Sequence, residues 1–111
     1  MCFIVDLHDD PALIARYRAW HAPGAVPKPV VAAMHADDIR ELEIWLHGTR
    51  MVLIMEVGPG FDPAAKAARD DANRDVQDWD RLMRTFQKPV PGAPEGQTWV
   101  AMERIHALAE Q

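Results

Sequence analysis

The spacing of apolar residues changes several times along the chain, and the order of these changes limits the possible folds more than any other feature. Segments in which apolar and polar residues alternate are typical of strands, and segments with apolar residues at intervals of three and four are typical of helices. Strands are expected at Cys2–Leu7, Ile39–Leu46, Met51–Val57 and Thr98–His106, and helices from Pro11 to about His21, at Pro29–Met34 and at Ala64–Phe86. The resulting order, β-α-β-β-α-β, predicts one α+β domain over residues 1–111, ferredoxin-like, with a four-stranded antiparallel sheet and helices on one face.

Proline, glycine and asparagine mark the boundaries of these segments. Asp10 precedes Pro11, a combination that starts helices because the carboxylate accepts free amide protons and proline already has a helical φ. Gly48 lies in the short connection between the second and third strands, which indicates a hairpin. Asn73 interrupts the last helical segment and predicts its division into two helices, because asparagine favours helix caps over interiors.

The third strand raises the question of what covers the second face of the sheet. Met51–Met55 is apolar at five consecutive positions, whereas a strand covered on one face only alternates. Helices of the same chain cover only one face of the predicted sheet, so another layer is needed. A second copy packed sheet to sheet would provide it, and we therefore expect a homodimer.

Composition and charge exclude several classes of function. The net charge is −5 with both signs interspersed, so the basic surface that nucleic acids require is missing. No apolar run approaches the ~20 residues that span a bilayer, and the first ten residues do not resemble a secretory signal. The single cysteine, Cys2, allows no internal disulfide and suits a reducing compartment. We expect a cytoplasmic protein with no nucleic-acid or membrane partner.

Common catalytic and cofactor motifs are absent. The glycine-rich nucleotide-binding motifs and the serine hydrolase motif GxSxG do not occur in the sequence. The histidines lack the spacing of metal ligands on any single element, so no metal site is expected. Candidate chemistry therefore rests on other polar and aromatic side chains.

Tyr17 and His21 are the first candidates, because residues four apart on a helix share a face. Phenol and imidazole groups together can give and take protons near neutral pH. The alternative is that Tyr17 belongs to the core and His21 only ends the helix. The spacing leaves both interpretations open.

Tryptophans and carboxylates supply the other candidates. The four tryptophans lie on different predicted elements, and indole faces stack on the apolar faces of sugars; they are Trp20, Trp45, Trp79 and Trp99. Core packing or a dimer interface is the alternative, and we expect it for at least two of them. A charged side chain in an apolar strand needs an oppositely charged partner or contact with water. Four glutamates are in this position: Glu41, Glu43, Glu56 and Glu103. Each is either a sugar-binding or acid–base carboxylate, or it pairs with an arginine such as Arg40, Arg50 or Arg104.

Taken together, these segments resemble the L-rhamnose mutarotase family over nearly the full chain. The matching segments are Tyr17–His21 at the end of the first helix, Ile44–Leu46, Met51–Glu56, and Asp75–Trp79 leading into Met83. Family members are ferredoxin-like proteins that pair as dimeric α+β barrels and interconvert the α and β anomers of 6-deoxy sugars. The resemblance implies that His21 is the proton donor, that Tyr17 binds the sugar, and that Trp79 is the first of two adjacent family tryptophans at the sugar.

The sequence departs from the family pattern at two positions. Asp80 replaces the second of the adjacent tryptophans, and a sugar-binding tyrosine on the second strand falls at about Leu42, where the nearby Trp45 can supply an aromatic surface. The expected substrate-binding residues are therefore Tyr17, Trp45, Trp79 and Asp80. L-fucose differs from L-rhamnose at C2 and C4, and the replacements slightly favour L-fucose as the substrate.

The reaction implied by the resemblance needs an acid and a base. The ring oxygen is protonated by His21 while a base removes the proton of the anomeric hydroxyl, and no metal, nucleotide or redox cofactor takes part. The base is left open between Tyr17, a carboxylate such as Glu103, and a water. Two other functions fit the same fold: a non-catalytic sugar-binding or structural dimer, and a cofactor-free oxygenase on a similar dimeric barrel.

Overall fold

The first strand, β1 (Cys2–Leu7), lies inside the sheet and joins its two halves. On one side it pairs with β3 (Arg50–Val57), which continues through a hairpin into the edge strand β2 (Ile39–His47). On its other side it pairs with two short strands, β4 (Gln87–Lys88) at one end and β5 (Val100–Ala101) at the other. All pairings are antiparallel, and the order is β2-β3-β1-β4. This computed structural model describes residues 1–111.

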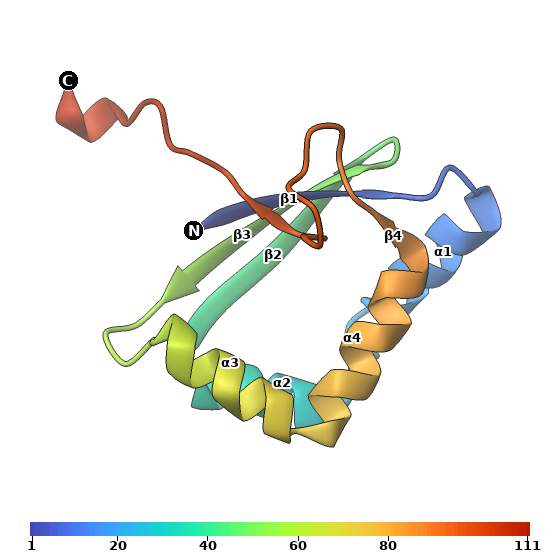
Figure 1. The fold of residues 1–111 in the computed structure, drawn as a ribbon, viewed down its shortest axis with the longest axis horizontal. Coiled ribbons are helices and arrows are strands. Elements are labelled where there is room, and N and C mark those ends of the chain that lie inside the picture. The colour runs from blue at the N-terminus through green and yellow to red at the C-terminus, as the bar shows by residue number, and fades with distance from the viewer.

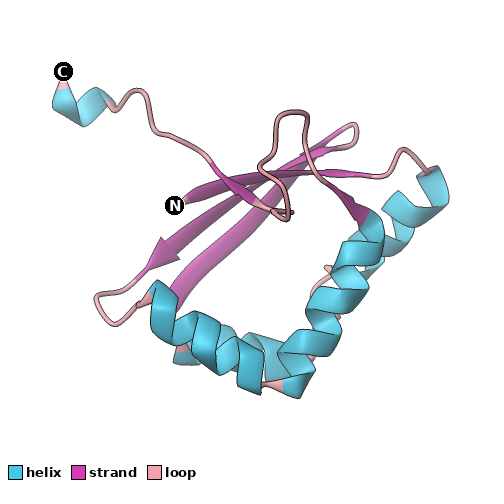
Figure 2. Cartoon of the chain, viewed as in Figure 1, coloured by secondary structure: helices cyan, strands magenta, loops and turns pink.

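Four α-helices lie on one face of this sheet (Figures 1 and 2). They are α1 (Pro11–Trp20), α2 (Lys28–Ala36), α3 (Pro63–Ala72) and α4 (Arg74–Phe86), and a 3₁₀ helix, η1 (Leu108–Glu110), follows near the C-terminus. Each of the two helical connections thus consists of two consecutive helices. The α+β class and the antiparallel sheet with helices on one face are confirmed.

Side-chain caps fix where the helices begin. The Asp10 carboxylate accepts hydrogen bonds from the backbone N–H groups of Ala12 (2.9 Å) and Leu13 (3.3 Å), which confirms the predicted start at Pro11. Asn73 ends α3 and caps α4, accepting from the N–H of Asp75 at 3.1 Å. The predicted division of the long helical segment at Asn73 is confirmed.

The hairpin between β2 and β3 is also confirmed. His47 pairs with Arg50, so only Gly48 and Thr49 form the loop. Gly48 has a φ of 61°, a left-handed conformation that glycine adopts without steric cost.

The last predicted strand, Thr98–His106, is wrong over most of its length. Only Val100–Ala101 forms a strand, and the N–H of Met102 makes one more bond to the carbonyl of Cys2 at 2.8 Å. The ammonium and carbonyl of Met1 are bonded to Met55 of β3, on the opposite side of β1 from β5. Residues 103–106 pair with no strand and extend away from the sheet (Figure 1). The two-residue strand β4 was not predicted.

The two faces of the sheet differ sharply in burial. On the helix side, Val5 and Met51 are 0% and 1% exposed and belong to the core with Tyr17 and Phe86. On the other side no element of the chain covers the sheet, and Ile54 is 47% exposed. The expectation that the chain's own helices cover one face of the third strand is confirmed.

Candidate active site

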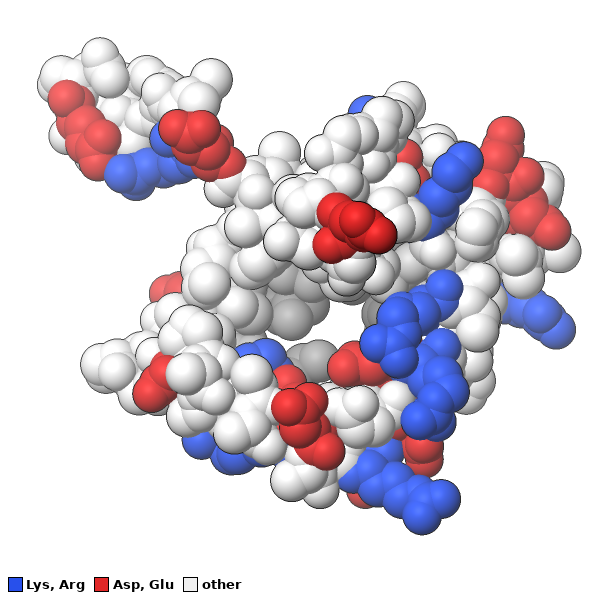
Figure 3. All heavy atoms as spheres, in the orientation of Figure 1, with Lys and Arg blue, Asp and Glu red and all other residues white.

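A cavity of about 700 Å³ lies between the helix-facing side of the sheet and the four helices. Figure 3 shows the hollow, with acidic and basic side chains gathered beside it on the helices. Sixteen of its 23 lining residues are hydrophobic, so the few polar groups that face it stand in apolar surroundings. This size and composition are typical of sites for small molecules.

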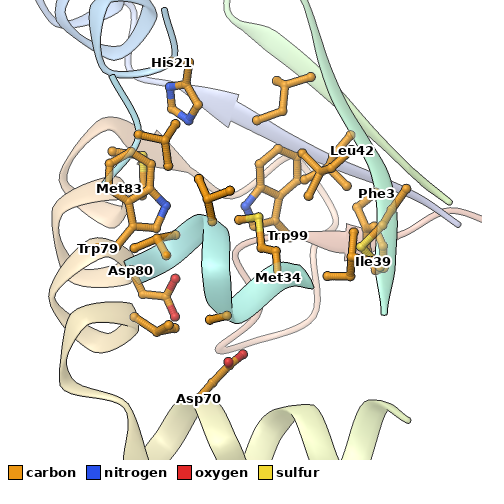
Figure 4. A pocket seen from close by; sticks show the side chains of 18 of the residues that line it. Phe3, His21, Met34, Ile39, Leu42, Asp70, Trp79, Asp80, Met83 and Trp99 are labelled. Atoms are coloured by element: carbon orange, nitrogen blue, oxygen red, sulfur yellow. The ribbon is translucent and has the colours of Figure 1, made fainter. Parts of the chain in front are cut away.

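His21 reaches the cavity from the C-terminal end of α1, where it caps the helix. Its Nδ1 lies 2.7 Å from the backbone carbonyl oxygen of Tyr17. A carbonyl only accepts hydrogen bonds, so Nδ1 carries a proton in both charge states of the ring. Proton exchange is thereby assigned to Nε2, and Figure 4 shows the ring at the cavity wall.

Two aromatic rings hold the imidazole in place. The ring of Tyr17 lies 4.4 Å from that of His21, and the indole of Trp79 lies 5.5 Å away in an edge contact. Trp20 supports Trp79 from behind, with ring centres 5.9 Å apart. The helical spacing of Tyr17 and His21 thus produces direct contact, as expected for residues four apart.

Tyr17 is buried, and its hydroxyl oxygen accepts a hydrogen bond from the side-chain amide of Gln87 at 3.2 Å. Burial raises the pKa of the phenol above its ordinary value, although the Gln87 hydrogen bond acts in the opposite direction. The phenol therefore remains protonated at neutral pH. It is suited to donate a hydrogen bond to a ligand and unsuited to act as a base.

The charged wall of the cavity is formed by α3 and α4. Asp80 and Arg84 come from α4, and Lys66 and Asp70 come from α3. The Lys66 ammonium is 2.7 Å from a carboxylate oxygen of Asp70. Burial, followed by the negative charge of Asp70, raises the pKa of Asp80, and the cations Arg84 and Lys66 only partly offset this.

A buried ion-pair network fixes the position of α3. Asp37, at the end of α2, is 2% exposed and pairs with Lys66 at 3.0 Å and with Arg69 at 2.8 Å. Although burial alone raises the pKa of Asp37, the hydrogen bonds and charges of these two cations lower it overall. Because Lys66 also holds Asp70, the network fixes the charged wall of the cavity.

The structure brings Tyr17, His21, Trp79 and Asp80 to this one cavity, but it does not bring Trp45 or Glu103 there. Trp45 is 63% exposed on the uncovered face of the sheet, and its indole N–H donates to Glu43 at 2.9 Å. Strand residues alternate between faces, so Leu42 and Ile44 face the cavity and Trp45 cannot.

Glu103 follows β5 in the exposed C-terminal segment, outside the cavity. Trp99, one of the four candidate tryptophans, was not among the expected substrate-binding residues, yet it lines the cavity. Sequence reasoning missed four further lining residues, for which the sequence carried no signal: Asp70, Lys66, Arg84 and Gln87.

The cavity is a site for acid–base chemistry on a small molecule. It combines an imidazole with one exchangeable nitrogen, a protonated phenol, a carboxylate and an indole.

A sequence model of the family described as L-rhamnose mutarotase matches residues 1–108. A protein of Xanthomonas campestris pv. campestris named L-fucose mutarotase is 49% identical over 110 residues, covering 99% of this chain and 88% of the relative. A protein of Dictyostelium discoideum, whose name states no activity, is 31% identical over 108 residues, covering 94% and 85% of the two chains.

The chain belongs to the L-rhamnose mutarotase family and is an isomerase. The structure contains no helix long and apolar enough to cross a membrane.

Proposed function

We propose that the protein interconverts the α and β anomers of a 6-deoxy-L-hexose, with L-fucose preferred over L-rhamnose, by acid–base opening and closing of the pyranose ring. The observation that carries this proposal is the position of His21, whose proton-exchanging nitrogen faces an apolar cavity beside Tyr17 and Trp79. Membership of the mutarotase family supplies the reaction class.

Each side chain has a distinct part in the proposed reaction. His21, in its cationic form, donates a proton from Nε2 to the ring oxygen as the bond between that oxygen and C1 breaks. Tyr17 donates a hydrogen bond to a sugar hydroxyl, since its phenol stays protonated. The indole of Trp79 offers an apolar surface to the C–H face of the sugar. After rotation about C1–C2, the ring closes and the proton returns to His21.

Two observations favour L-fucose. The relative that shares 49% of its residues with this chain is named L-fucose mutarotase. Asp80 stands where the family pattern has a second tryptophan, so a carboxylate replaces an aromatic surface at the sugar. A carboxylate accepts hydrogen bonds from hydroxyl groups and responds to their orientation at C2 and C4.

The uncovered face of the sheet supports a homodimer. A row of apolar side chains crosses this face from β2 to β5, formed by Trp45, Val52, Ile4 and Val100. A second row contains Ile54, which is 47% exposed. Contiguous exposed apolar surface of this kind marks an interface, and a second copy packed on it would form the two-sheet barrel expected from the family.

Anomer-exchange NMR tests the proposal directly. The rate of magnetisation transfer between the α and β anomeric protons is measured for L-fucose, L-rhamnose and D-glucose with catalytic amounts of protein. We expect enhanced exchange that is fastest with L-fucose and slowest with D-glucose. Sugar binding without enhanced exchange would instead indicate a non-catalytic sugar-binding protein.

A further inference from the structure

Ring opening requires a base as well as an acid, and the cavity contains only two carboxylates, Asp70 and Asp80. Asp70 is held by the Lys66 ammonium at 2.7 Å. Asp80 makes no hydrogen bond or ion pair with any other side chain of the protein, and it lines the cavity while remaining exposed to solvent. We propose that Asp80 is the general base that removes the proton of the anomeric hydroxyl. This inference rests on the proposed mutarotase function.

The other candidates for the base do not meet the requirements. Glu103 lies in the exposed segment after β5 and does not line the cavity. Burial raises the pKa of Tyr17, so its phenolate is scarce at neutral pH. Glu41, Glu43 and Glu56 point to the opposite face of the sheet. Among the acidic groups of the chain, only Asp80 is both unpaired and open to the cavity.

The position of Asp80 relative to the acid also fits the reaction. Asp80 follows Trp79 directly on α4, and the edge of the Trp79 indole contacts the ring of His21. Figure 4 shows the indole between the imidazole and the Asp80 carboxylate. The two oxygens that must exchange protons, the ring oxygen and the anomeric oxygen, are both bonded to C1. A sugar stacked on Trp79 with C1 toward the cavity centre therefore places both oxygens between the His21 imidazole and the Asp80 carboxylate.

The electrostatic surroundings strengthen Asp80 as a base. The other charged and titratable groups that line the cavity with Asp80 are Asp70, Lys66, Arg84, His21 and Tyr17. Burial and the neighbouring Asp70 raise the pKa of Asp80, and Arg84 and Lys66 act against this. A carboxylate with a raised pKa accepts a proton more readily than one in water.

The proposed step conserves atoms and charge. The proton of the anomeric hydroxyl moves to a carboxylate oxygen of Asp80, and the electrons of that O–H bond form the C1=O double bond. The bond from C1 to the ring oxygen breaks, and this oxygen takes the proton from Nε2 of His21. Ring closure on the other face of the aldehyde reverses each transfer, so both groups return to their starting states.

Asp80→Asn tests the assignment, because asparagine keeps the shape and removes the basic oxygen. We expect the variant to remain folded by circular dichroism, and its loss of turnover should exceed any change in KM for L-fucose. The turnover for anomer exchange should fall by about 10²-fold or more. Asp78→Asn is the matched control on the same helix, because the Asp78 side chain is 57% exposed and outside the cavity. It should exchange anomers at the wild-type rate.

Two further measurements separate a base from a residue that only binds the sugar. The rate of exchange by Asp80→Ala should rise with added formate, after subtraction of the enzyme-free rate, because formate can occupy the vacated space and accept the proton. In the wild type, kcat/KM should decline as acid protonates Asp80. Asp70→Asn should move this decline to lower pH, because it removes the negative charge that raises the pKa of Asp80.

Folded Asp80→Asn with wild-type turnover would overturn the assignment while leaving the mutarotase function intact. A reduced rate that formate does not restore, together with an acid limb unmoved by Asp70→Asn, would also overturn it in favour of a binding role. A wild-type protein that exchanges no anomers of any sugar would overturn the proposed function and the assignment together.

Discussion

Replacing His21 with alanine separates the catalytic role of the imidazole from its structural role. In the structure, the ring is partly exposed and contributes one hydrogen bond, from Nδ1 to the Tyr17 carbonyl, and two aromatic contacts. The hydrogen bond contributes about 1 kcal/mol, and water can replace it at a helix end. The aromatic contacts add about 1 kcal/mol more. The free energy of unfolding should therefore fall by about 1–2 kcal/mol.

The effect on activity should be much larger than the effect on folding. Removal of a general acid lowers the rate by ~10²-fold or more, which corresponds to about 2.7 kcal/mol or more of transition-state stabilisation. Saturation-transfer NMR on the anomeric protons of L-fucose measures this rate, and thermal unfolding at the same protein concentration measures stability. His35→Ala is the matched control, because His35 is exposed on α2 and does not line the cavity.

Both outcomes are open to contradiction. If His21→Ala is folded and exchanges anomers as fast as the wild type, His21 is not the acid. If the variant fails to fold, His21→Gln provides the second test, since its amide can still donate to the Tyr17 carbonyl but cannot act as an acid near neutral pH. Wild-type exchange by that variant would refute the mechanism.

Three further predictions concern stability, binding and assembly. Asp37→Ala should lower the free energy of unfolding by about 3 kcal/mol, near the low end for a broken buried ion pair, because its two cationic partners are partly exposed. The pKa of Asp37 in the folded protein is below its unfolded value of about 3.9. The stabilisation that ionised Asp37 provides is therefore complete above the unfolded pKa and is lost as pH falls through the folded pKa. Below about pH 4, the wild type should lose more stability on acidification than the variant. Tyr17→Phe should raise the KM for L-fucose, measured by steady-state kinetics, and an unchanged KM would contradict the binding role. Calorimetry should also show a loss of about 1–3 kcal/mol of stability, because the buried Gln87 amide loses its hydrogen-bond partner. The wild type should sediment at about twice the 12.5 kDa chain mass, and Ile54→Lys should sediment as a monomer. The control Ala67→Lys, at an exposed position of α3, should remain a dimer. A monomeric wild type would contradict the proposed interface.

Much of the fold was predictable because its signals are local. The caps at Asp10 and Asn73, the left-handed Gly48 and the alternation of β1 each depend on residues within a few positions in sequence. The contact of Tyr17 with His21 was predictable for the same reason, since helical geometry places residues four apart on one face.

The errors arose where the outcome depended on distant segments. The alternation of apolar and polar residues after Trp99 continues to Ile105. A strand forms only where another strand pairs with it, and the pairing with β1 stops at Ala101. Trp45 looked suitable for a sugar site by composition, yet the register of β2 places it on the face away from the cavity.

The sequence by itself determined the element order, the helix boundaries and the His21–Tyr17 pair, because neighbouring residues define all of them. Only the tertiary structure decided which groups surround the cavity. Asp70 and Lys66 meet Asp80 because the Asp37 ion pairs hold α3 to the end of α2, and both of these helices pack against α4. No spacing in the sequence encodes that meeting, since it depends on how helices separated by turns pack in three dimensions. The same packing leaves Asp80 unpaired and open to the cavity, and this is what makes its carboxylate available to a sugar.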